Sequence, residues 1–93
     1  MKELEFYEKA INLREKYEKD LLKTQILGAI VKEFFENYGR FQVFIIVPTI
    51  EENYFNLPPK EIFEVLEDFG IKCSRVVCSG DYECTIEDPK FKV

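Results

Sequence analysis

The side chains of this 93-residue chain that could carry chemistry are three cysteines and pairs of adjacent acids. Cys73, Cys78 and Cys84 are separated by four and five residues, and neither spacing fits a paired metal-binding knuckle or a redox C-x-x-C motif. An odd set of cysteines, behind an N-terminus without an apolar signal stretch, predicts reduced thiols in the cytosol. We therefore expect these cysteines to serve as small apolar side chains on a hairpin.

The acids and glycines form no catalytic constellation. The chain has no histidine, so the commonest general base, the Ser–His and Cys–His pairs and imidazole metal ligands are excluded. Glu51-Glu52 and Glu67-Asp68 are sequence neighbours, which seldom point into one site. The four glycines stand singly and form no phosphate-binding loop. We predict no catalytic, cofactor-binding or metal-ligating residue.

The net charge of −5 is unevenly placed, with −1 over residues 1–38 and −4 over residues 39–93. No cluster of Lys or Arg offers a footprint for phosphates, so direct nucleic-acid binding is disfavoured. An acidic surface could attract a basic protein, although such a charge is also ordinary for solubility. No apolar run approaches the length of a membrane span, and we expect a cytoplasmic protein without membrane contact.

The segment best suited to meeting another protein is the connection Thr49–Leu57. A connection of this length in a small domain is usually functional or flexible. If the strands on either side of it are parallel, it lies at the same rim of the sheet as the turn near residue 81. We predict a partner-binding site made of Glu51, Glu52, Tyr54, Phe55, Asp81 and Tyr82. The alternative is that the two rings of the loop fold back and cap the core.

Two helical segments are expected ahead of this loop, at 2–19 and 21–38. The run has no proline, and apolar side chains recur every three or four residues. One unbroken helix would be about 55 Å long, longer than the roughly 25–30 Å diameter of a domain of this size. We therefore expect a break near Lys19–Thr24, and a single long helix is the alternative for a dimer. The second segment is apolar around most of its circumference and should be the more deeply buried.

The remaining chain predicts a β-α-β-β unit, with strands at about 41–47, 71–78 and 82–87 and a helix at 58–69. The helix begins at two prolines and ends at Gly70, and residues 79–81 carry a hairpin signal. Residues 88–93 are expected to form a loose tail. The sequence thus predicts a single α+β domain with a three-stranded mixed sheet.

The hairpin makes its two strands neighbours, so the strand at 41–47 must lie at an edge of the sheet. This strand is the most apolar of the three and has no lysine to discourage pairing. Its own helices, a second copy or a strand of a partner should cover it.

From Ile26 to Ile86, one helix ends in Gly before a strand and a second helix ends in Gly before a hairpin. The residues that carry this layout are Ala29-Ile30, Gly39-Arg40-Phe41-Gln42-Val43, Leu57, Val65-Leu66, Gly70-Ile71-Lys72-Cys73 and Tyr82-Glu83-Cys84-Thr85-Ile86. The layout resembles small proteins encoded by phages of low-GC bacteria, although the chain lacks their aromatic finish and has a longer middle loop. The resemblance implies no activity; it implies an accessory protein that acts by binding.

These observations predict a small, non-enzymatic protein-binding or regulatory protein, encoded by a phage or a mobile element. One alternative is a structural homo-oligomer joined through the 41–47 strand edge or the N-terminal helices. Another is an enzyme that uses carboxylate or cysteine chemistry.

Overall fold

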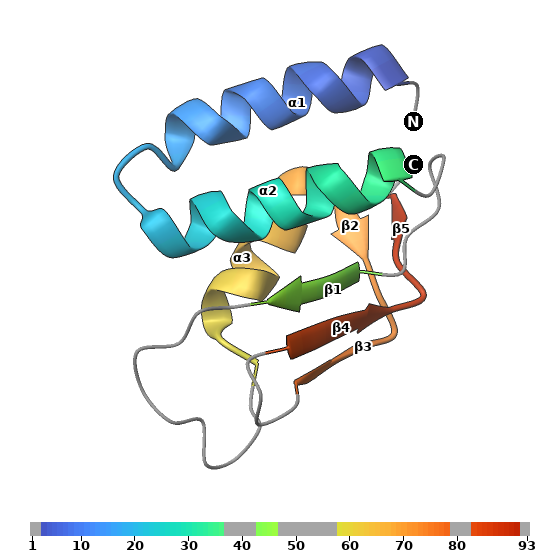
Figure 1. The fold of residues 1–93 in the computed structure, drawn as a ribbon. Coiled ribbons are helices and arrows are strands. Elements are labelled where there is room, and N and C mark those ends of the chain that lie inside the picture. Colours follow the sequence, from blue (N-terminus) through green and yellow to red (C-terminus); the bar gives the residue numbers. More distant parts are fainter. Residues whose placement is uncertain (1–2, 37–42, 47–57, 79–82, 92–93) are drawn as a thin grey trace.

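The structure is a computed structural model and describes residues 3–36, 43–46, 58–78 and 83–91. Its elements are α1 (Glu3–Lys16), α2 (Leu21–Glu36), β1 (Val43–Ile46), α3 (Lys60–Phe69), β2 (Ile71–Lys72), β3 (Arg75–Cys78), β4 (Glu83–Glu87) and β5 (Lys90–Phe91). The two long helices lie side by side and antiparallel, and the strands follow beneath them (Figure 1). The predicted α+β class, with two helices ahead of the first strand, is confirmed.

The break between the two helices falls at residues 17–20 and is held by local hydrogen bonds. Asp20 acts as the N-cap of α2, because its Oδ1 accepts a hydrogen bond from the backbone N–H of Lys23 at 3.1 Å. The Thr24 hydroxyl lies 2.9 Å from the carbonyl oxygens of both Tyr17 and Asp20, to which it donates. The predicted division into two helices is therefore confirmed, and the break begins slightly earlier than the predicted Lys19–Thr24.

The predicted mixed sheet is wrong, because every strand pairing in the described residues is antiparallel. The three-stranded sheet has the order β1-β4-β3. Strands β1 and β3 run in the same direction, as a crossover through α3 requires, but β4 lies between them and pairs antiparallel with both.

The prediction of a loose tail at 88–93 is wrong for residues 90–91, which form β5 and pair with β2. The partners are Ile71 with Phe91, Lys72 with Lys90, Arg75 with Glu87 and Cys78 with Cys84. No residue is inserted between these pairs on either side, so β2–β5 and β3–β4 are two stretches of one hairpin in one register.

The hairpin is interrupted where the single predicted strand 71–78 divides into β2 and β3. Asp88 has a φ of 51°, and Pro89 has no backbone N–H to give to a ladder. Ser74 bridges the gap: its N–H donates to the Glu87 carbonyl at 2.9 Å, and its hydroxyl lies 2.9 Å from Asp88 Oδ2.

Helix α3 ends at Gly70, as the sequence predicts. Gly70 adopts the left-handed conformation with a φ of 76°, and its N–H donates to the Glu67 carbonyl at 3.1 Å. Pro59 occupies the N-cap position, so the helix starts slightly later than the predicted residue 58. The buried stripe of α3 consists of Ile62, Val65, Leu66 and Phe69.

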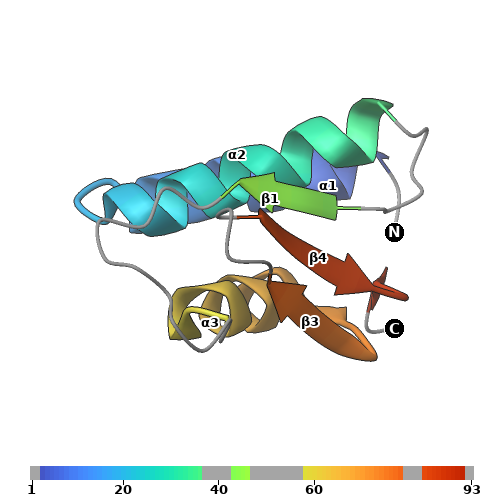
Figure 2. The same cartoon turned by 60° about the horizontal axis from the view of Figure 1, so that its bottom comes forward.

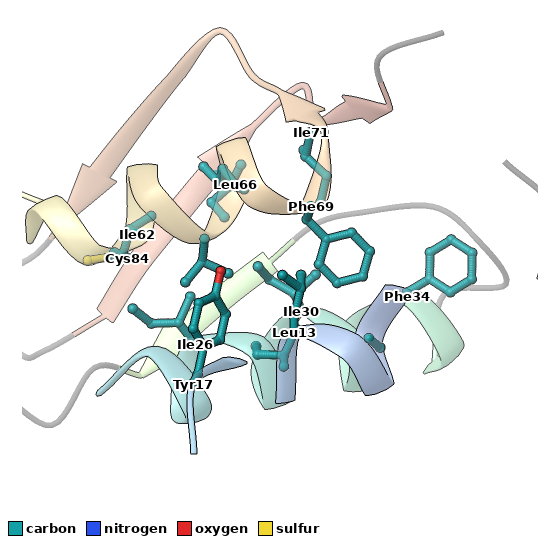
Figure 3. Packing of buried hydrophobic residues seen from close by; sticks show 14 of the residues in the cluster. Leu13, Tyr17, Ile26, Ile30, Phe34, Ile62, Leu66, Phe69, Ile71 and Cys84 are labelled. Carbon is teal, nitrogen blue, oxygen red and sulfur yellow. The ribbon is translucent and has the colours of Figure 1, made fainter. Parts of the chain in front are cut away.

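The core lies between the helical hairpin, α3 and the strands (Figure 3). Phe6 of α1 stacks on Phe34 of α2 with ring centroids 3.8 Å apart, and Phe69 of α3 lies 4.8 Å from Phe6. Phe91 of β5 meets Phe6 edge-on at 5.8 Å. The C-terminal strand therefore helps to close the aromatic cluster.

The predicted edge position of the first strand is confirmed, because β1 is the outer strand of its sheet. Helix α2 runs along β1 on the side away from β4 (Figures 1 and 2). The chain's own helix therefore takes the place beside this strand.

Candidate protein-binding surface

The predicted site residues Glu51, Glu52, Tyr54, Phe55, Asp81 and Tyr82 all lie outside the described residues. The strand ends that flank them are described. Ile46, at the end of β1, pairs with Glu83, and Cys78, at the end of β3, pairs with Cys84. The C-terminal ends of β1 and β3 therefore lie at the same end of the sheet, although β1 and β3 are not neighbouring strands.

The prediction of three reduced thiols is wrong for two of the cysteines. Cys78 and Cys84 are directly opposite each other on β3 and β4 and form a disulfide. Cys73 is free and half-buried, and burial raises the pKa of its thiol. The disulfide removes the thiol argument for a cytosolic location.

A groove of about 440 Å³ runs between α1 and α2. Its lining residues are Tyr7, Ala10, Ile11, Arg14, Thr24, Leu27, Gly28, Val31 and Lys32. Ala10 and Leu27 are buried and lie at the floor, where the two helices meet. The lining is largely apolar, which is typical of sites that receive the apolar face of a partner.

An apolar stripe on α1 borders this groove and faces away from the core. Leu4, Tyr7 and Ile11 follow one another at helical spacing, and they are 69%, 45% and 57% exposed. The core uses a different stripe of the same helix: Phe6, Ala10, Leu13 and Tyr17. Single exposed apolar residues are common, whereas a stripe continuous with an apolar groove is typical of interaction surfaces.

Gly28 lies in the middle of α2 and lines the groove. Among the described residues, no atom lies within 4 Å of a Cβ built on it, so their packing does not require a glycine here. Glycine in the interior of a helix lowers stability by about 0.5–1 kcal/mol relative to alanine. Its absent side chain therefore leaves open space that a partner's side chain can enter.

Two charged side chains line the groove among the described residues, and both are cations. Arg14 lies on α1 and Lys32 on α2. Lys32 is 3.9 Å from Glu36, but both side chains are largely exposed, so this pair contributes little. The groove thus presents positive charge on a chain whose net charge is negative.

A polar cluster on the other side of the hairpin fastens it to α3. The hydroxyl of Tyr17 donates to Asp68 Oδ2 at 2.5 Å, and Lys16 Nζ lies 3.1 Å from the same oxygen. Lys23 Nζ pairs with Glu64 at 2.7 Å. The Tyr17 hydroxyl points from the hairpin toward α3 in Figure 3.

The pKa values in this cluster reflect the close contact. Burial and the bond to Asp68 raise the pKa of Tyr17. The hydrogen bond from Tyr17, helped by Lys16, lowers the pKa of Asp68. The hydrogen bond to Glu64 raises the pKa of Lys23. All these shifts favour the protonation states that bond at neutral pH, so the cluster serves to hold the structure together.

Sequence reasoning missed the groove, although it carried two signals. α1 has apolar residues at 4, 7 and 11 beyond those of its core stripe, and Gly28 interrupts a run otherwise suited to helix. The apolar circumference of α2 predicted deep burial on most sides, but Leu21 is 72% exposed and Gly28 is open to solvent. Part of that apolar surface lines the groove instead.

Among the described residues, no three His, Cys, Asp or Glu side chains come together as metal ligands. No helix in the described ranges is long and apolar enough to cross a membrane. Comparisons with protein-family models, with curated proteins and with solved structures gave no match.

Proposed function

We propose that this protein is a small, non-enzymatic binding module that receives a helix of a protein partner against the α1–α2 face. The observation that carries the proposal is the apolar groove together with the exposed stripe Leu4, Tyr7 and Ile11. Docking of an amphipathic helix in such a groove is a common mode of recognition, in which side chains at i, i+3, i+4 and i+7 supply the contacts.

Two features of the sequence support a binding role. The chain has no histidine, and its layout resembles small phage-encoded accessory proteins, for which an origin in a phage or mobile element is part of this proposal. The acidic and aromatic residues of the middle loop, Glu51, Glu52, Tyr54 and Phe55, with Asp81 and Tyr82, are proposed as a second contact region for the partner.

Self-association through the N-terminal helices is the second candidate function, since the same exposed stripe would serve it. The β1 edge is the weaker choice for self-association, because α2 already runs along that strand (Figure 2).

Site-specific photo-crosslinking tests the binding role. The crosslinker p-benzoyl-phenylalanine replaces Ile11 in one variant, Tyr54 in a second and the exposed Lys72 of β2 in a control, and each is expressed in the cells that encode the protein. We expect a discrete adduct from position 11 that is absent from position 72, and mass spectrometry identifies it. Equal adducts from both positions, or none from position 11, would rule out the α1–α2 face; the result at position 54 tests the loop in the same way.

A further inference from the structure

The occupant of the α1–α2 groove can be named from the charges and spacings of the chain itself. We propose that a second copy of this protein docks its own α1 in the groove, in a parallel two-fold dimer. Glu8 and Glu15 of that copy then meet Lys32 and Arg14, and its Ile11 lies near Gly28. This inference rests on the proposed function, since it names the partner of the same surface.

The outer face of α1 has the pattern that the groove needs. Leu4, Glu8, Ile11 and Glu15 follow one another at intervals of three or four residues, so they share one face of the helix, and all four are exposed. Within the part of the chain that the structure describes, no ion pair holds Glu8, Glu15 or Arg14. The face therefore offers an apolar strip flanked by two carboxylates two helical turns apart.

The positions along the helix axes match this pattern. Helices α1 and α2 are antiparallel, and the stacking of Phe6 on Phe34 fixes their relative position along the helix axis. A residue of α1 is therefore level with the residue of α2 whose number, added to its own, gives about 40. Lys32 is then level with residue 8 of α1, and Gly28 is level with residue 12. Arg14 lies six residues further along α1 than residue 8, so Lys32 and Arg14 are about 9 Å apart along the helix axis. Glutamates at i and i+7 are about 10.5 Å apart, and the long side chains span the difference.

A two-fold axis parallel to α1 preserves these heights. Under that symmetry, Glu8 of the second copy lies level with Lys32, Glu15 lies next to Arg14, and Ile11 lies next to the space at Gly28. The incoming helix lies over the line where α1 and α2 meet. Its Leu4, Tyr7 and Ile11 face their equivalents on α1, and its Ile11 also lies beside the space at Gly28 of α2. Its Glu15 reaches Arg14 of α1, and its Glu8 reaches Lys32 of α2. The contact is self-complementary, as a two-fold dimer requires, and both copies gain the same two ion pairs.

An antiparallel dimer lacks this charge match. In an antiparallel pair of α1 helices, the same side of each helix lies against the same side of the other. The side of α1 that carries Glu8 and Glu15 would then lie next to Glu8 and Glu15 of the second copy. Like charges opposite each other oppose association. An alkyl chain with a single carboxylate, such as a fatty acid, could pair with only one of the two cations.

Charge exchange between two variants tests the dimer in the full chain. Variant A carries Glu8→Lys and Glu15→Lys, and variant B carries Arg14→Glu and Lys32→Glu. In a dimer of variant A alone, or of variant B alone, the facing side chains all carry charges of the same sign. We therefore expect the self-association of each variant to weaken at least tenfold relative to the unchanged protein. An equimolar mixture of A and B restores both ion pairs and should form heterodimers, measured by sedimentation and by native mass spectrometry.

The matched control is a variant with Lys60→Glu and Lys72→Glu, which has the same net charge as B but leaves the groove unchanged. Mixed with A, it should form far less heterodimer than B does, because opposite charges then meet in only one of the two grooves and like charges meet in the other. If A pairs with the control as well as it pairs with B, net charge alone drives association and the proposed contacts are wrong. Gly28→Leu places a side chain in the groove, where the described residues leave room for it. Circular dichroism should show that this variant is folded, and sedimentation should show that it no longer dimerises.

Disulfide crosslinking in a Cys73→Ala background distinguishes the two orientations. In a parallel dimer, the cysteine of Leu4→Cys should form a disulfide with the same cysteine of the second copy, and so should that of Ile11→Cys. In an antiparallel dimer, equivalent residues meet at only one position along α1, so at most one of the two variants should crosslink. A monomer by light scattering over a hundredfold range of concentration, or self-crosslinking at position 11 but not at position 4, would overturn this inference. An Ile11 photo-adduct with a different protein would then still support the proposed function.

Discussion

Gly28 lies within a helix and Gly70 lies just after one, and their backbones differ in whether they tolerate a side chain. Gly28 is in the interior of α2 and has open space beside it, whereas Gly70 has a φ of +76° and Lys9 Nζ 3.1 Å from an added Cβ. Gly28→Ala should therefore raise the free energy of unfolding by about 0.5–1 kcal/mol. Gly70→Ala should lower it by about 1–2 kcal/mol, because a left-handed backbone disfavours a Cβ.

Urea unfolding of both variants at protein concentrations where the chain is monomeric measures this pair of effects. Each variant is the control for the other, since both add one methyl group. The same sign for the two changes would contradict the conformations assigned to these glycines.

Tyr17 and Asp68 make the stability of the fold depend on pH at both ends of the scale. The lowered pKa of Asp68 means that its contribution is complete above the unfolded pKa, about 4, and is lost as pH falls through the folded value. The raised pKa of Tyr17 acts in the opposite range: its contribution is complete below about pH 10 and is lost as pH rises toward the folded value.

Tyr17→Phe should lower the free energy of unfolding by about 1–2 kcal/mol at pH 7, because Asp68 loses its hydrogen-bond donor. The variant should also lose less stability than the unchanged protein between about pH 4 and pH 2. Urea titrations at pH 7 and pH 3 measure both effects. Asp68→Asn is the companion variant, and its pH dependence in the acid range should be flatter as well; an unchanged acid dependence in both variants would show that this pair does not control it.

At the scale of the elements, the disulfide is the feature that most affects the β3–β4 hairpin. Closing a loop this short stabilises the fold by about 2 kcal/mol in the chain-entropy account. Reduction, or Cys78→Ala with Cys84→Ala, should lower the midpoint of urea unfolding accordingly, whereas Cys73→Ala should change it little. Alkylation of the unfolded chain, read by mass spectrometry, should modify one thiol without reductant and three with it. Three modified thiols without reductant would contradict the disulfide.

The sequence predicted the elements better than their pairing. The length of the N-terminal run required a break, and Asp20 caps the helix that follows it. The edge position of β1 followed from the hairpin, but pairing with β3 or with β4 was equally compatible with the pattern. The tail was missed because Asp88 and Pro89 are typical of a strand end, while the register that continues into β5 depends on contacts with β2.

The groove was missed for a related physical reason. The period of a helix shows which residues share a face, but not which of two apolar faces the core will cover. Phe6 and Leu13 are covered by α2 and α3, whereas Leu4 and Ile11 are not, and only the packing decides between them.

At the scale of the whole molecule, the helices and the strands share one aromatic cluster, with a Cα radius of gyration of 12.7 Å. This value is close to the roughly 12 Å expected for one compact domain of this length. We expect α-helical circular dichroism and tyrosine fluorescence to report a single coincident unfolding transition. Two separated transitions would show that the helical hairpin and the strands fold as independent units.

The shared register of β2–β5 and β3–β4 limits how this protein can change in length. One residue added to or removed from the segment 79–82 would shift both stretches of the hairpin together and reverse the faces of every side chain on one arm. Cys78 would no longer oppose Cys84, and Ile86 and Phe91 would turn away from the core at the same time. Relatives of this chain are therefore expected to keep the number of residues between β3 and β4, or to alter it only in steps that leave the alternation intact, while the identities of those residues vary.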